Sequence, residues 1–288
     1  MKTITVIEYK EKVLKLYEEV YKILEEELVP WWVHSGTLLG IKRHNSQMIP
    51  WDDDIDIMVP ANIWKEKLGS INDKLWKKNY KLIDWTFTDL KIKSDAWFAR
   101  VYFDKEYIVS SDDGKNKSAY PQRPFIDIFY AVPSSSMKNE FQWKKYKFYV
   151  KLQWALRPGF DRYLSAKNNK IKSFLMNLIS YPVKFFFSYK RVNKYLIKPY
   201  NHKGDWNKLR RADAWSTRKN IYNIDDMEIG SISNKKAIYS KEWENELVES
   251  YGRNWKKEVY TEPHVFRNYF GKWERANEIK KILDKTYK

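Results

Sequence analysis

Residues 31–60 read WWVHSGTLLGIKRHNSQMIPWDDDIDIMVP and place four aspartates within five positions. Successive side chains of an extended strand point to opposite faces, so the second half of this stretch separates into two sets. One face carries aspartates: Asp52, Asp54 and Asp56. The other carries branched apolar residues: Ile55, Ile57 and Val59. The sequence therefore predicts a strand with one buried face and one acidic face.

Converging carboxylates on a rigid element are what hard divalent cations such as Mg²⁺ or Mn²⁺ require from a protein. We predict that Asp54 and Asp56 are metal ligands and catalytic residues, with Asp52 as a further candidate ligand. A solvated turn or a helix cap is the alternative for such a cluster. The alternation with isoleucine and valine favours the site, because a strand gains no stability from three acids on one face.

The residues before the acidic stretch predict a second half of the site. An apolar strand over 31–34 is followed by a tight turn at Ser35 and Gly36 and a short helix from Thr37 to Arg43. Glycine lets a ligand approach the backbone closely, and a helix amino terminus offers free N–H groups to phosphate. A plain helix cap has the same appearance.

We therefore predict donor or phosphate binding by five residues: Ser35, Gly36, Thr37, Arg43 and His44. An arginine can hold two phosphate oxygens with its planar guanidinium. For Arg43 and His44, simple surface solvation is the alternative. His34 lies inside the apolar strand and is expected to be a buried core histidine.

A third acid is expected from RPFIDIFYAVP, residues 123–133, where Asp127 lies in an apolar strand. A lone buried charge is costly unless it is paired or bound to a metal. Asp127 is therefore either a third member of the acidic site or the partner of an arginine such as Arg100 or Arg123.

Composition restricts the classes of function. Lys and Arg number 54 against 37 Asp and Glu, which gives a net charge of +17 and favours a polyanionic partner. The absence of cysteine excludes disulfides, zinc-thiolate sites and thiol catalysis. The amino-terminal residues follow helical spacing and lack the apolar core of a signal peptide, so we expect an amphipathic helix and a cytoplasmic protein.

Two strings, SGTLLGIKRH and IPWDDDIDIMV, resemble the LicD family, which includes bacterial phosphocholine transferases and relatives of fukutin and of the fukutin-related ribitol-phosphate transferase. FIDIFYAVP, residues 125–133, extends the resemblance, and LVESYGRNW, residues 247–255, is similar to the family's Tyr-Gly element. Ser46 stands about where the family has a glycine. The resemblance implies that Asp127 is the third acid of the site.

The implied fold is α/β, with a nucleotidyltransferase-like mixed sheet, flanking helices and a mainly helical carboxy-terminal part. We expect a catalytic core over 1–133 and a mainly helical part over 134–288 that completes the substrate site, in one integrated unit. The implied activity is metal-dependent transfer of a phosphorylated alcohol, phosphocholine or ribitol phosphate, from a CDP-activated donor to a hydroxyl of a cell-surface glycan or its lipid-linked precursor.

Two other functions remain open from the sequence. A nucleotidyltransferase would attach NMP to a small molecule, a protein or an RNA end and would release pyrophosphate instead of CMP. A basic nucleic-acid-binding module would explain the charge but would leave the aspartates without a role, and no known binding signature accompanies it.

Residues 170–200 combine aromatic and aliphatic residues with seven basic residues. The apolar run is too interrupted to span a bilayer, so we expect either an element at an anionic membrane surface, on the inner face, or a pair of ordinary helices with basic outer faces.

Overall fold

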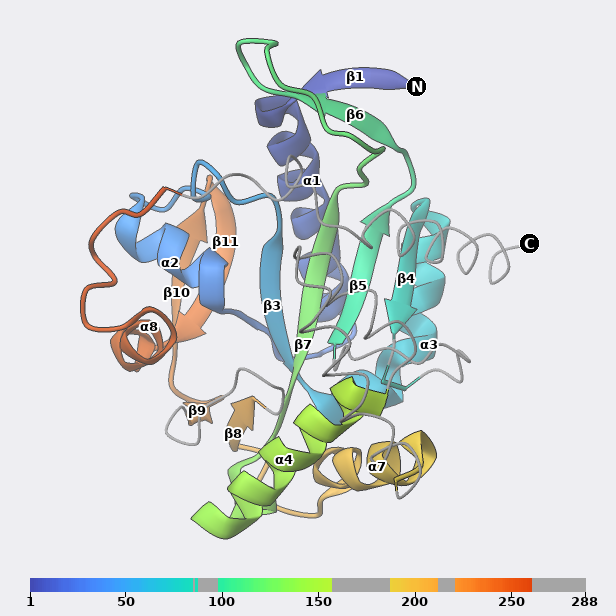
Figure 1. Cartoon of the computed structure of the whole chain (residues 1–288), viewed down its shortest axis with the longest axis vertical. Coiled ribbons are helices and arrows are strands. Elements are labelled where there is room, and N and C mark those ends of the chain that lie inside the picture. Colours follow the sequence, from blue (N-terminus) through green and yellow to red (C-terminus); the bar gives the residue numbers. More distant parts are fainter. Residues whose placement is uncertain (85, 88–97, 157–186, 212–220, 261–288) are drawn as a thin grey trace, which may run out of the picture.

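The computed structural model describes residues 1–84, 86–87, 98–156, 187–211 and 221–260. Its centre is a mixed sheet of seven strands that curls into a half-barrel (Figure 1). The main path of this sheet follows the order β2 (Trp32–Val33), β3 (Ile55–Pro60), β7 (Phe125–Pro133), β5 (Phe98–Phe103) and β4 (Tyr80–Asp84). Two short strands extend it beyond the end of β7: β8 (Lys208–Arg211) and β9 (Tyr222–Asn223). The prediction of an α/β fold with a mixed sheet is confirmed.

Strand pairing fixes the positions of the candidate acids. β3 and β7 run parallel, and Asp56 lies opposite Asp127 in their register. β5 is antiparallel to β7 and places Arg100 opposite Asp127 on its other side. The centre of the sheet therefore aligns two acids and one arginine on three adjacent strands.

Two helices cover the face of the sheet that lies to the rear in Figure 1: α1 (Val6–Glu26) and α3 (Ala61–Lys77). A capping box between Thr5 and Glu8 begins α1, since each side chain accepts a hydrogen bond from the other's backbone N–H. The expected apolar face of β3, which is Ile55, Ile57 and Val59, is fully buried in the core beneath α1. The predicted amphipathic helix and the predicted buried face are both confirmed.

The opposite side carries smaller elements. α2 (Ser35–Arg43) packs against α8 (Trp243–Tyr251) and the hairpin of β10 (Met227–Ile232) with β11 (Lys235–Ser240). A parallel pair, β1 (Lys2–Thr5) and β6 (Tyr107–Ser110), closes the upper end of the molecule in Figure 1.

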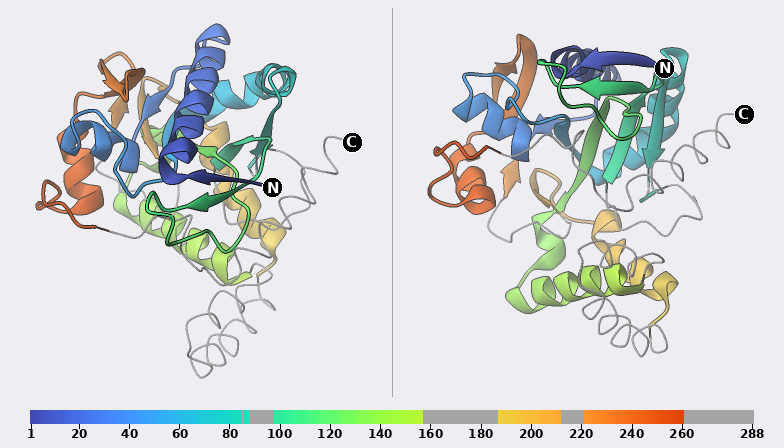
Figure 2. Two further views of the ribbon diagram at one scale, coloured as in Figure 1. Left: turned by 90° about the horizontal axis from the view of Figure 1, so that it is seen from above. Right: turned by 45° about the horizontal axis from the view of Figure 1, so that its top comes forward.

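At the lower end, α4 (Glu140–Leu156) lies beside α7 (Tyr189–Leu196), with short 3₁₀ turns at Ser134–Met137 and Lys198–Asn201 (Figure 2, right). After position 134 the described residues thus begin with these helices, continue with four strands within 208–240 and end with the helix α8. β8 pairs with the last residues of β7, so the sheet continues across the expected boundary at 133/134. The division into two parts stays a prediction.

Element boundaries differ from the expected ones. The acidic strand begins at Ile55, because the Asp52 N–H bonds the Ile49 carbonyl at 3.0 Å and closes a turn. The alternation nevertheless continues backwards, with Asp53 buried between the partly exposed Asp52 and Asp54. The apolar strand at 31–34 is only the two residues of β2.

The helix expected from Thr37 begins two residues earlier, at Ser35. Ser35 itself has a φ of +51°, so the left-handed residue of this turn is the serine and not Gly36.

Candidate functional site

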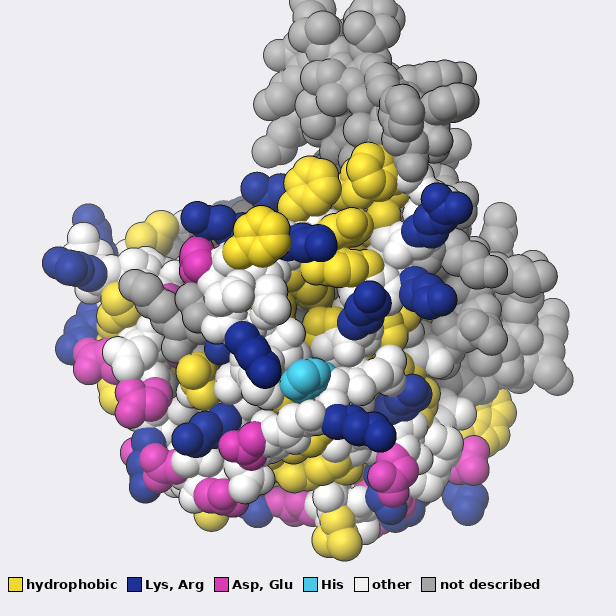
Figure 3. Space-filling view, turned by 90° about the horizontal axis from the view of Figure 1, so that it is seen from below, with side chains coloured by type: hydrophobic (Ala, Val, Ile, Leu, Met, Phe, Trp, Pro, Cys, Tyr) yellow, Lys and Arg dark blue, Asp and Glu magenta, His cyan; other side chains and the backbone are white. Residues whose placement is uncertain are grey.

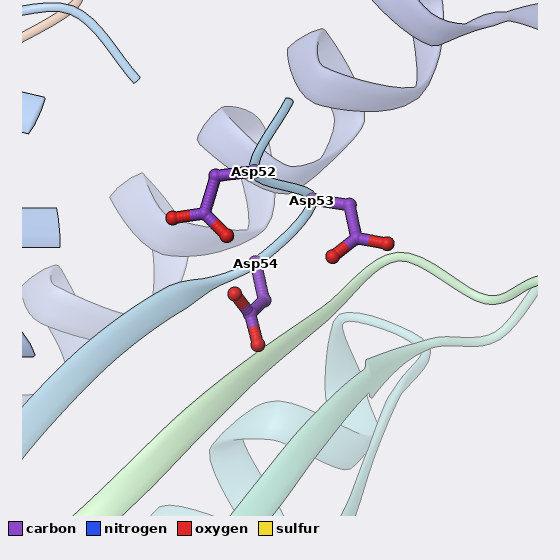
Figure 4. Close-up of side chains that lie close together, drawn as sticks. All are labelled: Asp52, Asp53 and Asp54. Atoms are coloured by element: carbon purple, nitrogen blue, oxygen red, sulfur yellow. The ribbon is translucent and has the colours of Figure 1, made fainter. Parts of the chain in front are cut away.

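Three acids meet on the side of the sheet away from α1. Asp54, Asp56 and Asp127 each offer a carboxylate oxygen, and these oxygens lie within 4.8 Å of one another. Asp54 also shares a second group of the same kind with Asp52 and Asp53, on the segment that leads into β3 (Figure 4). Hard oxygen ligands this close together suit a divalent cation.

The electrostatics of these acids agree with a cation site. Burial raises the pKa of Asp54 well above its usual range, and the charges of Asp56 and Asp52 raise it further. Burial and the charges of Asp127 and Asp52 likewise raise the pKa of Asp56, while the Arg211 guanidinium and a hydrogen bond from the Gly36 backbone oppose this. A positive ion would relieve the repulsion that the fold imposes.

Asp127 has both of the roles that the sequence left open, as a member of the acidic cluster and as the partner of an arginine. It lies with the other two acids, and it also forms a bidentate ion pair with Arg100, in which Nη2 is 2.6 Å from Oδ2 and Nε bonds Oδ1. The Arg100 guanidinium stacks on Phe125, with 3.8 Å from Cζ to the ring centroid. Arg123, the other proposed partner, bonds Glu106 instead.

The start of α2 faces these acids. A Cβ added to Gly36 would lie 2.7 Å from Oδ2 of Asp52, so only glycine permits this close approach. The Thr37 hydroxyl accepts a hydrogen bond from the Asp56 N–H at 2.8 Å and fixes the start of β3. Gly36 and Thr37, two of the five residues predicted to bind donor or phosphate, thus lie beside the acidic cluster.

Arg43 and His44, at the other end of α2, have different partners. Arg43 bonds Nε2 of His44 at 3.0 Å and the carbonyl oxygen of Trp255 at 3.2 Å. The His44 ring contacts Trp51 edge-on, with 5.6 Å between centroids. Among the described residues, Arg43 makes no hydrogen bond to an aspartate, so the structure does not bring it together with the three acids.

An arginine that the sequence did not single out lies nearer. Nη1 of Arg211, at the end of β8, donates to the Ser35 hydroxyl at 3.1 Å, and its Cζ is 4.3 Å from the Phe129 ring centroid. His34 is buried as expected, and its Nδ1 is 2.8 Å from the Ser35 hydroxyl oxygen. No sequence signal marked Arg211, because its proximity arises only from the pairing of β8 with β7.

α8 supplies two further groups. Glu246 is 4% exposed, accepts the Ser35 N–H at 3.1 Å, and has its pKa raised to about 7, mainly by burial. Loss of solvation at the phenol and the charges of Asp56 and Asp52 raise the pKa of Tyr251, although the residue is 43% exposed. Gly252 then ends the helix with a φ of +82°. The Tyr-Gly element at 247–255 had marked the end of this helix in the sequence, whereas no sequence signal marked Glu246.

Comparison with known proteins finds a similarity that includes the three clustered acids. Residues 28–159 match the family model described as "LicD/FKTN/FKRP, nucleotidyltransferase domain". The similarity to the LicD family thus covers a little under half of the chain. The match contains α2, β3 and β7, and therefore all three clustered acids, whereas Arg211 and Glu246 lie outside it.

Three individual proteins are similar to parts of this chain. The chain is 24% identical over 212 residues to the lipopolysaccharide cholinephosphotransferase LicD of Haemophilus influenzae, covering 71% of this chain and 74% of the relative. Uncharacterised proteins of Rickettsia prowazekii and Rickettsia typhi are each 43% identical over 49 residues, or 16% of this chain. Those alignments span 18% and 16% of the two rickettsial proteins. The family model and the relative from Haemophilus influenzae therefore agree in pointing to the LicD kind of protein.

Proposed function

We propose that this protein is a metal-dependent transferase that moves a phosphorylated alcohol from a CDP-activated donor to a hydroxyl of a glycan or of its lipid-linked precursor. The observation that carries the proposal is the set of Asp54, Asp56 and Asp127 within a LicD domain. The relative from Haemophilus influenzae is named a cholinephosphotransferase, which makes phosphocholine the first candidate group and ribitol phosphate the second.

Asp54, Asp56 and Asp127 would hold Mg²⁺ or Mn²⁺, with Asp52 as a further ligand. Burial, and then repulsion between the acids, raise the pKa values of Asp54 and Asp56, and this supports the proposal because a bound cation would offset both effects. When bound, such a cation would neutralise phosphate oxygens and charge on the leaving nucleotide.

The protein's own residues would position the donor phosphates. Ser35, Gly36 and Thr37 lie at the amino end of α2, where the helix dipole favours negative charge. Arg211, hydrogen-bonded to Ser35, adds a guanidinium at the same place. Arg43 and His44 stay candidates for contact with a more distant part of the donor.

Asp127 and Asp52 are the two candidates for accepting the proton of the acceptor hydroxyl. Arg100 bonds both oxygens of Asp127, so the atoms that would accept the proton already have a partner. Asp52 is therefore the better candidate, although positioning contributes more than a base to phosphoryl transfer.

A donor panel tests the proposal. The purified chain would be incubated with Mg²⁺ or Mn²⁺, a glycan acceptor and one donor at a time from among CDP-choline, CDP-ribitol, CDP-glycerol, nucleoside triphosphates and nucleotide sugars. We expect CMP from CDP-choline, whose ammonium the abundant aromatic residues could bind through cation–π contacts, with CDP-ribitol as the close rival. Asp54→Asn is the inactive control.

The second candidate is a nucleotidyltransferase, which the family description itself names. Pyrophosphate released from CTP or ATP, without CMP from any CDP-alcohol, would replace the leading proposal with this one.

A further inference from the structure

α4 has an outer surface on which large apolar side chains are exposed. Phe141 and Phe148 are 74% and 55% exposed, and their spacing of seven residues places them two turns apart on one side of the helix. Two exposed lysines share this side, Lys144 and Lys151, and exposed Lys145 lies toward α7, with its Nζ 5.6 Å from the Tyr195 ring centroid. We call the two phenylalanines and the three lysines the α4 outer face.

The other side of α4 packs against the core. Trp143, Tyr146 and Val150 are buried in the main core. α7 lies alongside, where Tyr149 stacks on Tyr195 with 4.1 Å between ring centroids. The two phenylalanines therefore stay exposed although the helix already has an apolar face in the core, and two exposed aromatic rings on one short helix face are unfavourable in water.

Charge on this end of the molecule is strongly one-sided. α7 adds exposed Arg191 and Lys194, and Lys198 follows it, while α7 contains no acid. Glu140, at the start of α4, lies 3.8 Å from Lys144, and both side chains are largely exposed. Figure 3 shows hydrophobic and Lys or Arg side chains next to one another on this end, with Asp and Glu gathered toward the lower edge of the view.

We propose that the α4 outer face docks on an anionic lipid surface, with Phe141 and Phe148 inserted among the headgroups and the lysines paired with lipid phosphates. Exposed aromatics flanked by lysines on one helix side are the pattern of interfacial helices. α4 lies at one end of the molecule, where a flat surface can reach it (Figure 1). None of the described helices combines the length and the apolar character needed to cross a bilayer.

This inference is independent of the transferase reaction and differs from the sequence expectation for 170–200. Of that segment, residues 170–186 lie outside the described residues, and 187–200 contain α7 and the following 3₁₀ turn. The membrane role of 170–200 stays a separate proposal, and the α4 outer face can be tested without altering any of its residues.

Vesicle flotation of the full chain tests the proposal without donor or acceptor. Neutral phosphatidylcholine vesicles would be compared with vesicles that contain phosphatidylglycerol, at low and high salt. We expect binding to the anionic vesicles that weakens with salt. Phe141→Ser with Phe148→Ser, and separately Lys144→Gln with Lys145→Gln and Lys151→Gln, should each lower the partition coefficient at least tenfold.

Matched controls lie elsewhere on the surface. Ile229→Ser removes an apolar side chain that is 74% exposed on β10, and Lys115→Gln removes a lysine whose side chain is 81% exposed. Both controls should bind as the wild type does, and all variants should keep its thermal melting temperature. Wild-type binding by either α4 variant, equal binding to neutral vesicles, or no binding by the unaltered protein would overturn the proposal.

Discussion

Asp54 and Asp56 are held in the ionised form only at a cost, because burial and neighbouring carboxylates raise both pKa values. For an acid with a raised folded pKa, stability falls as the pH rises from the unfolded to the folded pKa. Neutral asparagine does not carry this cost. Without metal at pH 8, Asp54→Asn and Asp56→Asn should therefore melt at or above the wild-type temperature.

The same two variants should lose at least about a hundredfold in turnover, because transfer at an acidic cluster depends on its bound cation. Mn²⁺ should raise the wild-type melting temperature and leave both variants unchanged. Asp73→Asn, on the exposed surface of α3, is the matched control. A folded Asp54→Asn protein with near-wild-type activity would refute the assignment.

Glu246 gives the protein a separate pH dependence. Its folded pKa of about 7 exceeds the ordinary 4.5, so wild-type stability should fall between these values as the pH rises. Glu246→Gln keeps an acceptor for the Ser35 N–H and lacks the charge. Its stability relative to wild type should increase from pH 5 to pH 8 by at most about 3 kcal/mol.

Urea unfolding at several pH values measures this difference. Glu244→Gln, an exposed position on the same helix, should show no such trend. A parallel pH dependence of Glu246→Gln and wild type would show that Glu246 titrates normally.

At the level of elements, the loop between α2 and β3 contains Ser46, which stands about where the family has a glycine. Asn45 and Ser46 have φ values of +51° and +59°, the region that glycine adopts without strain. The loop is held by backbone bonds from the Ser46 N–H to Ile41 and from the Ser233 N–H to the Ser46 carbonyl. Ser46 thus adopts, at a small cost, a backbone conformation that a glycine would adopt without strain.

Ser46→Gly should stabilise the protein by up to about 1 kcal/mol, because it relieves the left-handed serine and keeps both backbone bonds. Thermal or urea unfolding measures the change. Ser70→Gly, inside the helical backbone of α3, should have the opposite sign. A loss of stability in Ser46→Gly comparable to that in Ser70→Gly would contradict the strain argument.

At the level of the whole molecule, the region that matches the family packs against elements outside the match. α1 precedes residue 28 and covers Ile55, Ile57 and Val59, while β8 and α8 follow residue 159 and complete the site. Residues outside the match therefore provide both the covering of the core and two charged groups of the site.

An isolated fragment of residues 28–159 should fail to unfold cooperatively, because the removal of α1 exposes the apolar face of β3. Circular dichroism and thermal melting of the fragment, beside the full chain, measure this. A sharp transition in the fragment at the temperature of the full chain would show that α1 and the later elements contribute little.

The sequence by itself determined the acidic strand, its buried face, the amphipathic first helix and the proximity of Ser35, Gly36 and Thr37 to the aspartates. These features depend on side-chain periodicity and on residues close in the chain. It also supplied Asp127 as a candidate, with a cluster and an ion pair as alternatives. Only the tertiary structure showed that both occur, since strand register places Asp56 and Arg100 on opposite sides of Asp127.

Arg211 and Glu246 needed the folded chain for a related reason. Each contacts Ser35 across more than 170 residues, through the pairing of β8 with β7 and the packing of α8 on α2. Long-range pairing leaves no periodic trace in the sequence near either residue. Local pattern therefore fixed the acids and the apolar faces, whereas the charges that surround them were decided by which distant strands and helices the core brings together.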